Sequence, residues 1–284
     1  MAISYDLHSH STASDGTLSP TALVERAHEA GVDVLSLTDH DTLDGLAEAA
    51  QAAEPLGVTL IPGVEVSITW SNMTIHVLGL NVQPDNAELR SELLKQQEFR
   101  VWRAAEIARK LEQAGIAGAL AGARSFCRGR ILSRTHFAHF LVHCGHARSL
   151  QDVFRRFLVK GKPGYVSGAW TELPQALDAI RGAGGLPVIA HPARYRLTRS
   201  KLQRLIGDFR AAGGLGLEVV SGSHSRDETL HMGALARTNG LFASCGSDYH
   251  GPEKPWVQLG NLRELPQGCA PIWQAAGWPG GALA

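Results

Sequence analysis

Two kinds of hydrophobic pattern alternate along the chain. Short apolar runs rich in Val, Ile and Leu predict strands, and stretches with an apolar residue every three or four positions predict helices. The predicted strands are residues 3–9, 32–39, 58–67, 73–80, 186–192, 215–222 and 241–248. The predicted helices between them include residues 20–31, 43–57, 173–184, 200–213 and 225–240. This alternation favours an α/β fold with a largely parallel sheet, and seven strands suggest a closed or nearly closed barrel.

Residues 86–164 interrupt the alternation. Amphipathic helices are predicted at residues 89–115, 131–145 and 150–161, and no strand signal lies between them. We therefore expect an all-α insertion, a substrate-binding cap, between the fourth and fifth strands. Residues 1–85 and 165–284 are then expected to form the barrel. The tail from about Pro266, which contains several Gly and Pro residues, is expected to be loosely ordered.

Composition narrows the class of protein. The 284 residues are 44% hydrophobic and 19% charged, as is typical of a soluble globular protein. No apolar run approaches the roughly 20 residues that cross a bilayer, and the N-terminus MAISYDLHSH lacks the features of a secretory signal. We therefore expect a cytoplasmic protein without a membrane partner. The four cysteines form no C-x-x-C pair and are expected to be free thiols rather than metal ligands.

The charges are unevenly distributed although the formal net charge is zero. Residues 86–164 hold 15 Lys and Arg against 6 Asp and Glu, a balance of +9. The rest of the chain holds 12 against 21, a balance of −9. The acidic part could hold cations and the basic part could attract an anion to them, although a solvated basic face would show the same excess.

Nearly every predicted strand carries or ends in a side chain that can bind a metal ion. His8 and His10 share one face of the first strand because side chains alternate along a strand. An H-x-H pair alone would more simply be two surface histidines. However, the C-terminal ends of parallel strands meet on one face of a barrel, so side chains far apart in the sequence converge there. The candidates are His8, His10, Asp15, His40, Glu65, His76, His191, Asp248 and His250.

Six segments that contain these residues resemble the motifs of the PHP (polymerase and histidinol phosphatase) superfamily. They are YDLHSHSTASDG, LSLTDHDT, PGVEVS, IHVLGL, IAHPAR and GSDYHGP, and the resemblance extends to about residue 262. The order of motifs and the helical insert resemble bacterial phosphoesterases that remove the 3′-phosphate from nucleoside 3′,5′-bisphosphates. The resemblance implies a distorted (β/α)7 barrel with a trinuclear metal centre.

The resemblance also implies how the nine residues divide among three metal ions. One ion would take His8, His10, Glu65 and Asp248; a second would share Glu65 and add His76 and His191; the third would take Asp15, His40 and His250. Some relatives carry histidine at the position of Asp15. The carboxylate is a harder ligand than imidazole. Imidazole and carboxylate ligands without thiolate suit Mn²⁺, our first choice, or Zn²⁺ or Fe²⁺.

These ions would generate a hydroxide nucleophile at neutral pH and neutralise the phosphoryl group. We assign catalytic roles to His191, Asp248 and Arg194, because Arg194 stands three residues beyond His191 and can reach the reacting phosphate. Asp39, next to His40, is expected to support the site or cap a helix rather than to bind metal.

Substrate recognition is expected to involve the basic insertion. Four arginines lie within residues 124–134, and we expect Arg124 and Arg128 to be solvated. Arg130 and Arg134 are four residues apart and would share a helix face, where two guanidinium groups could bind a second phosphate. Weaker candidates for substrate contacts are His136, Lys162 and His224.

The leading hypothesis is a phosphatase for a small nucleotide with two phosphates, such as 3′-phosphoadenosine 5′-phosphate. The alternatives are a 5′→3′ exoribonuclease acting on short RNA, a histidinol or sugar phosphatase, and a noncatalytic metal-stabilised binding module. The tryptophans show no spacing typical of a long single-strand stacking platform. No obligate protein partner is inferred.

Overall fold

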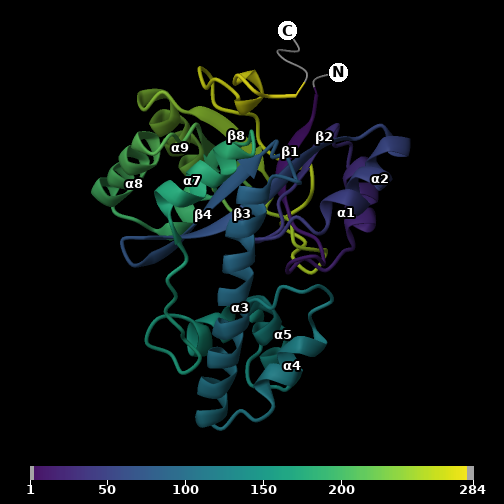
Figure 1. Ribbon diagram of the computed structural model, residues 1–284, viewed down its shortest axis with the longest axis vertical. Helices are drawn as coiled ribbons and strands as arrows, with labels where there is room; N and C mark the ends of the chain where they lie inside the picture. The colour runs from purple at the N-terminus through teal and green to yellow at the C-terminus, as the bar shows by residue number, and fades with distance from the viewer. Residues whose placement is uncertain (1–2, 280–284) are drawn as a thin grey trace.

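The computed structural model describes residues 3–279 and shows an eight-stranded sheet that curves into a nearly closed barrel (Figure 1). The sheet order is β1-β2-β3-β4-β6-β7-β8, with the short β5 paired to β3. An isolated bridge between Ser9 and Tyr249 joins the two ends of this order. The strands are β1 (Tyr5–Ser9), β2 (Val34–Leu37), β3 (Thr59–Trp70), β4 (Met73–Leu80), β5 (Thr171–Glu172), β6 (Leu186–Ile189), β7 (Gly216–Ser221) and β8 (Phe242–Gly246).

The seven predicted strands are present in a largely parallel sheet, with β4 as the exception to the parallel order, and the two-residue β5 was not predicted. β4 runs antiparallel to both β3 and β6, whereas the other pairs are parallel. The cause is the two-residue connection between β3 and β4, Ser71 and Asn72, whose φ angles are 51° and 60°. Two positive φ angles are typical of the tight turn of a β-hairpin, which forces the next strand to return alongside the first.

The predicted helices between the strands are present and lie outside the barrel (Figure 1). Ser19 caps the first of them by accepting a hydrogen bond from the backbone N–H of Ala22, and Gly57 ends the second with a φ of 68°. These helices are α1 (Pro20–Glu29), α2 (Leu46–Leu56), α7 (Leu173–Gly182), α8 (Arg199–Ala211) and α9 (Arg226–Thr238). Short 3₁₀ turns follow β6 and β8, η2 (Pro192–Tyr195) and η3 (Ile272–Gln274).

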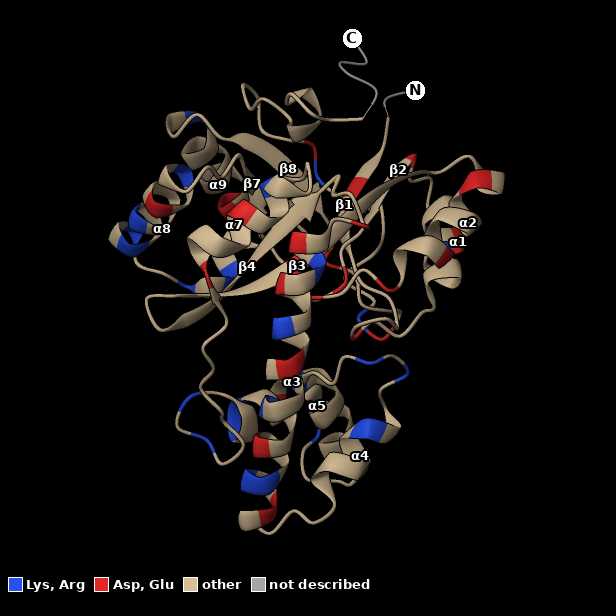
Figure 2. Ribbon diagram, viewed as in Figure 1, with Lys and Arg blue, Asp and Glu red and all other residues tan. Residues whose placement is uncertain are grey.

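A group of helices that we call the cap follows β4 in the chain and precedes β5. Its elements are α3 (Ala87–Gln113), α4 (Ala119–Ser125), α5 (Arg134–His143), α6 (Leu150–Val153) and the π-helix η1 (Phe154–Leu158). Neither α4 nor the π-helical geometry of η1 is evident from the hydrophobic pattern of the sequence. The cap has its own apolar core, which includes Ile107, Leu111, Phe137 and Leu141. Figure 2 shows many Lys and Arg residues on its helices and loops.

The expectation of a loosely ordered tail was wrong for the part that the structure describes, residues 266–279. Trp273 stacks on Tyr5 with ring centroids 3.9 Å apart, and Ile272 is fully buried. The backbone N–H of Ala243 also donates to the carbonyl of Ala270. The apolar residues of this segment therefore complete the barrel core despite the neighbouring Gly and Pro. Residues 280–284 lie outside the described part. None of the described helices combines the length and apolar character needed to cross a membrane.

Candidate active site

The nine predicted metal ligands lie together at the end of the barrel that faces the cap. Most of them stand at the C-terminal ends of strands or in the loops that follow, where parallel-barrel topology places functional residues. Glu65 and His76 are exceptions because they lie within β3 and β4. β3 continues well beyond Pro62, which is paired with the last residue of β2, so Glu65 reaches the same region as the loops.

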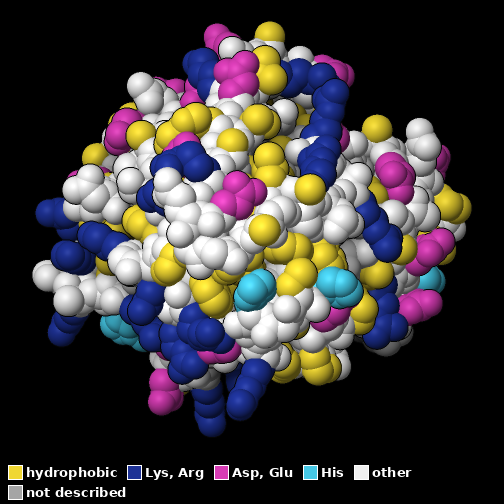
Figure 3. All heavy atoms as spheres, turned by 90° about the horizontal axis from the view of Figure 1, so that it is seen from below, with side chains coloured by type: hydrophobic (Ala, Val, Ile, Leu, Met, Phe, Trp, Pro, Cys, Tyr) yellow, Lys and Arg dark blue, Asp and Glu magenta, His cyan; other side chains and the backbone are white. Residues whose placement is uncertain are grey.

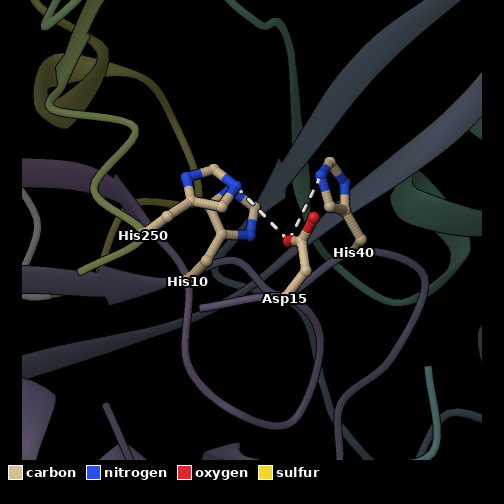
Figure 4. Close-up of side chains that lie close together, drawn as sticks. All are labelled: His10, Asp15, His40 and His250. Atoms are coloured by element: carbon tan, nitrogen blue, oxygen red, sulfur yellow. Dashed lines mark ion pairs between the residues drawn. The ribbon is translucent and has the colours of Figure 1, made fainter. Parts of the chain in front are cut away.

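The ligand atoms form three groups, each with its atoms within 4.8 Å of one another. The groups are His10, Asp15, His40 and His250; His8, Glu65, His191 and Asp248; and His40, Glu65 and His76. Figure 4 shows the first group, with Asp15 between the rings of His40 and His250. His10 and His191 thus fall into other groups than the resemblance implied, and the division of ligands among individual ions stays a prediction.

Glu65 is the centre of this arrangement. It is fully buried, and one carboxylate oxygen lies 2.8 Å from Nδ1 of His76 and 3.0 Å from Nε2 of His191. The other oxygen lies 2.9 Å from Nδ1 of His40 and 3.2 Å from Nε2 of His10. Nε2 of His8 lies 3.4 Å from the same oxygen. One side chain therefore faces five imidazoles, which is the position a shared ligand would take.

The hydrogen-bond geometry of His250 fits a neighbouring cation. Its Nδ1 lies 2.9 Å from the carbonyl oxygen of Asp248, and because a carbonyl only accepts, Nδ1 carries the proton. In the neutral ring, Nε2 then presents a lone pair to the carboxylate of Asp15, 3.3 Å away. Two acceptors facing each other repel, and a metal ion between them removes the repulsion.

His8 leads to the same conclusion from the other side of the site. Its Nδ1 donates to Glu218 at 3.2 Å, which leaves the lone pair of Nε2 pointing at His10, Glu65 and Asp248 at 3.1 to 3.4 Å. Within residues 3–279, several buried polar atoms here have no partner in hydrogen-bonding geometry, even where they are close together: Nδ1 of His10, Oδ1 of Asp15, Nδ1 of His40, Oε2 of Glu65 and Nδ1 of His191. Such a concentration of unpartnered polar atoms fits metal ligation.

The pKa values show the strong coupling among these groups. Burial lowers the pKa of His10, but Asp248 and Glu65 outweigh burial and raise it to about 9. Burial dominates at His40 and lowers its pKa to about 4. Burial would raise the pKa of Glu65, yet the surrounding imidazoles hold it well below its usual range. The carboxylates of the site are therefore ionised and available as ligands.

Two buried carboxylates support the ligands from behind. Glu218, which the sequence analysis did not identify, accepts from Nδ1 of His8 and from the backbone N–H of His191. It thereby fixes the ring orientation of His8. Asp39 points away from the ligands and accepts from both the N–H and the hydroxyl of Ser11 at 2.8 and 2.6 Å. It holds the loop that leads to Asp15, which is the supporting role expected of it.

A cavity of about 730 Å³ separates the metal ligands from the cap. Its barrel side includes His40, His76, His191 and Asp248. Its cap side includes three arginines, Arg100 and Arg103 of α3 and Arg134 of α5, which we call the arginine wall. The cavity thus has ligands for cations on one side and guanidinium groups on the other.

The arginine wall has a surplus of positive charge. Arg100 pairs with the buried Asp41 at 2.6 Å and donates to the hydroxyl of Ser67 at 3.0 Å. Within residues 3–279 this is the only ion pair formed by the wall, so Arg103 and Arg134 have no carboxylate partner. The Nε of Arg103 has no hydrogen-bond partner either, although the residue is only 8% exposed.

The surroundings of the wall make this surplus costly. Burial, and then repulsion by Arg134 and Arg100, holds the pKa of Arg103 well below its usual value. The guanidinium groups of Arg100 and Arg103 stack on Trp170 at 5.0 and 5.2 Å from the ring centroid. An aromatic ring offers no full negative charge, so the wall is suited to bind an anion.

Only some of the other predicted substrate residues line the cavity. Arg194 lines the cavity and forms an ion pair with Asp248, while its side chain remains 49% exposed. Arg130 and Lys162 are exposed and outside the residues that line the cavity. Two predicted contacts have structural partners instead: His136 accepts from the N–H of Ser133 in a capping box, and His224 donates to the carbonyl of Val219.

Comparisons with known proteins agree with this geometry. A PHP domain family model matches residues 6–125. The chain is 47% identical to a 3′,5′-nucleoside bisphosphate phosphatase of Chromobacterium violaceum over 95% of each chain. It is 46% identical to a 5′-3′ exoribonuclease of Escherichia coli, covering 96% of this chain and 94% of that one. A structure of a C. violaceum protein described as an amidohydrolase, with bound sulfate and no metal, superposes with a TM-score of 0.91 at 47% identity and covers 94% of each chain.

Proposed function

This chain belongs to the PHP domain family of metal-dependent phosphoesterases, and on that premise we propose that it removes the 3′-phosphate of nucleoside 3′,5′-bisphosphates. The products are a nucleoside 5′-monophosphate and inorganic phosphate. The observation that carries the proposal is the pairing of two unlike sites across one cavity. A substrate with two phosphates can place one at the metal ligands and the other at the arginine wall.

We propose Mn²⁺ as the metal, with Zn²⁺ or Fe²⁺ as possible substitutes, because the donors are imidazole and carboxylate without thiolate. The nine ligands would hold up to three ions, one for each ligand group. Bound divalent ions supply Lewis acidity toward the phosphoryl oxygens and lower the pKa of water that they bind. The protein holds the ligands in place through buried supports such as Glu218 and Asp39.

Arg194 is the residue best placed to contact the reacting phosphate directly. Its ion pair with Asp248 directs the guanidinium group into the cavity, and its exposed donors remain free for a phosphoryl oxygen. Charge on those oxygens would be stabilised by a donor already in position.

The arginine wall would bind the remote 5′-phosphate. Arg103 and Arg134 lack carboxylate partners, so a phosphate there gains charge-assisted hydrogen bonds without displacing an existing ion pair. Binding energy from this remote group would orient the scissile phosphate and thus lower the barrier to its hydrolysis. A monophosphate at the metal ligands would leave Arg103 and Arg134 without a charged partner among the described residues.

A second candidate function is 5′→3′ exonuclease activity on short RNA. The similarity to the exoribonuclease of E. coli favours it, since that relative is covered over 94% of its length. RNA with a 5′-phosphate would use the same wall for its terminal phosphate and the same ligands for the next phosphodiester. Both functions are consistent with the predicted cytoplasmic location, which the four free cysteines also support.

Steady-state turnover with Mn²⁺ tests these candidates. We expect 3′-phosphoadenosine 5′-phosphate to have a higher kcat/KM than histidinol phosphate, and ¹⁸O from labelled water to appear in the released phosphate. If the bisphosphate is not hydrolysed but 5′-phosphorylated RNA is degraded, the protein is an exonuclease and not a bisphosphate phosphatase. No turnover of any of the three substrates would favour a metal-stabilised binding module.

A further inference from the structure

A second hollow lies beside the active-site cavity, on the cap. It has a volume of about 600 Å³ and is lined by Arg148, Ser149, Gln151, Asp152, Arg155 and Arg156. Ser149 and Gln151 also line the active-site cavity, so the two spaces share a wall. We call this hollow the arginine groove. Figure 3, which views the molecule from the cap side, shows Lys and Arg side chains gathered over part of this face.

The arginine groove carries more positive charge than its single acid can balance. Asp152 pairs with Arg155 at 2.7 Å and with Arg156 at 3.3 Å, so its charge is already engaged. Arg155 is exposed over 78% of its side chain, and Arg148 is paired with no carboxylate side chain among the described residues. The groove therefore has an excess of two positive charges close to the rim of the active site.

We propose that the arginine groove binds the sugar-phosphate backbone of an RNA substrate downstream of the nucleotide held at the metal ligands. This inference rests on the exonuclease candidate above. The active-site cavity has the size of a site for one small ligand. A longer strand must leave it, and the shared wall of Ser149 and Gln151 leads directly to guanidinium groups that suit phosphate.

The groove's lining also predicts how RNA would be bound. None of its six lining residues is aromatic, so the contact would be electrostatic rather than based on base stacking. Binding through phosphates alone is tolerant of sequence and depends strongly on salt. The groove would therefore lower KM for longer RNA without selecting particular bases.

The test compares wild type with the double variant Arg148→Gln/Arg155→Gln. Arg156 is left intact because it also donates to the carbonyl of His146 at 2.7 Å and supports the local fold. Substrates are 3′-phosphoadenosine 5′-phosphate and a 5′-phosphorylated RNA of about eight nucleotides, assayed between about 50 and 200 mM salt. We expect KM for the RNA to rise about tenfold, and its salt dependence to lose about 1.4 from the log–log slope, since each single-strand phosphate contact contributes about 0.7. Bisphosphate kinetics should not change.

A matched control removes the same charge elsewhere, with Arg199→Gln/Arg210→Gln on α8 at the outer side of the barrel. An equal rise in KM for the RNA in this control would mean that overall charge is responsible, and it would overturn the proposal for the arginine groove. Equal losses on RNA and bisphosphate would show that the arginines only shape the active site, which also overturns it. Wild-type turnover of bisphosphate but not of RNA would refute the groove and leave the phosphatase proposal standing. Turnover of neither substrate would refute both.

Discussion

The barrel end and the arginine wall face each other across one cavity and have opposite imbalances of charge. At the barrel end, carboxylate oxygens and imidazole nitrogens converge, and several of these buried atoms have no hydrogen-bond partner within residues 3–279. In the arginine wall, only Arg100 among the three arginines is paired with a carboxylate within residues 3–279, that of Asp41. Buried charges without partners are costly to a fold. Each region therefore specifies the component that would complete it, cations for the barrel end and an anion for the wall.

Two arginines of the wall are almost equally buried but differ in whether they have a carboxylate partner. Arg100 and Arg103 are similarly buried, at 6% and 8% exposure, but among the described residues only Arg100 is paired with a carboxylate. Arg100 therefore connects the cap to the loop after β2, whereas Arg103 is left for a ligand. Four substitutions, in order of decreasing expected effect, test this division.

The largest effect is expected from Glu65→Gln, which removes the central charge of the barrel end. Loss of several kcal/mol of metal-based charge stabilisation corresponds to about a thousandfold or greater fall in kcat/KM, at 1.36 kcal/mol per factor of ten. Elemental analysis should show fewer bound ions than in wild type. The control is Glu54→Gln, at an exposed position on α2, which should leave both quantities unchanged. Full metal content with wild-type turnover in Glu65→Gln would contradict a shared ligand.

Next is Asp41→Asn, which removes the carboxylate that pairs with Arg100. Breaking a buried ion pair leaves an uncompensated charge, so we expect the free energy of unfolding to fall by about 3–5 kcal/mol. Inorganic phosphate should restore part of the loss because it binds the more positive wall of the folded state. Thermal unfolding with and without phosphate measures both effects. The exposed Asp44→Asn serves as the control, and an equal phosphate shift in all three proteins would argue against an anion site at the wall.

Arg103→Gln should affect binding rather than stability. A lost charge-assisted contact costs about 1.5–3 kcal/mol, which would raise KM for a bisphosphate by roughly 10- to 150-fold. Turnover of a generic monophosphate ester should be unaffected. The melting temperature should stay constant or rise, because the variant removes a buried charge that Arg100 and Arg134 repel. Arg130→Gln, at an exposed position outside the cavity, is the control. Equal losses on both substrates would make Arg103 structural.

The smallest effect is expected from Glu218→Gln, which weakens the support behind His8. Loss of such a supporting carboxylate reduces metal affinity by about 10- to 100-fold. Metal titration of activity should therefore shift to higher Mn²⁺ concentration, while the activity at saturating metal recovers. A defect that persists at saturating metal would show that Glu218 acts on the reaction itself and not through the orientation of His8.

The sequence predicted the barrel end better than the wall, for a physical reason. Side chains at the ends of parallel strands must converge whatever the details of packing, so His8, His40 and Asp248 could be placed together from the strand pattern alone. Glu65 lies within β3 and reaches the same region because β3 continues beyond its pairing with β2. Glu218 escaped notice because a single acid within an apolar strand carries no spacing signal. In the structure it stands where the β7–β8 register shifts, which the simple strand alternation does not reveal.

The arginine wall depended on orientations that spacing does not determine. Arg130 and Arg134 were expected to share a helix face, but α5 begins only at Arg134, so Arg130 lies in the preceding loop. Arg100 and Arg103 belong to a helix with exposed arginines as well, and the sequence does not distinguish the buried ones. Their direction follows from the packing of α3 against both the barrel and the rest of the cap.

The long helix α3 constrains how this protein can accept insertions and deletions. Its beginning packs in the barrel core through Leu89 and Leu93, and its end packs in the cap core through Ile107 and Leu111. One residue added between Leu93 and Arg100 would rotate the remainder by about 100° and advance it by about 1.5 Å. The two apolar ends of the helix would then no longer face their cores at the same time, and the guanidinium groups would no longer face the cavity. Length changes in this helix should therefore be tolerated only near whole numbers of turns, about 7 or 11 residues at a time, whereas the loops between α4 and α5 are free of this constraint.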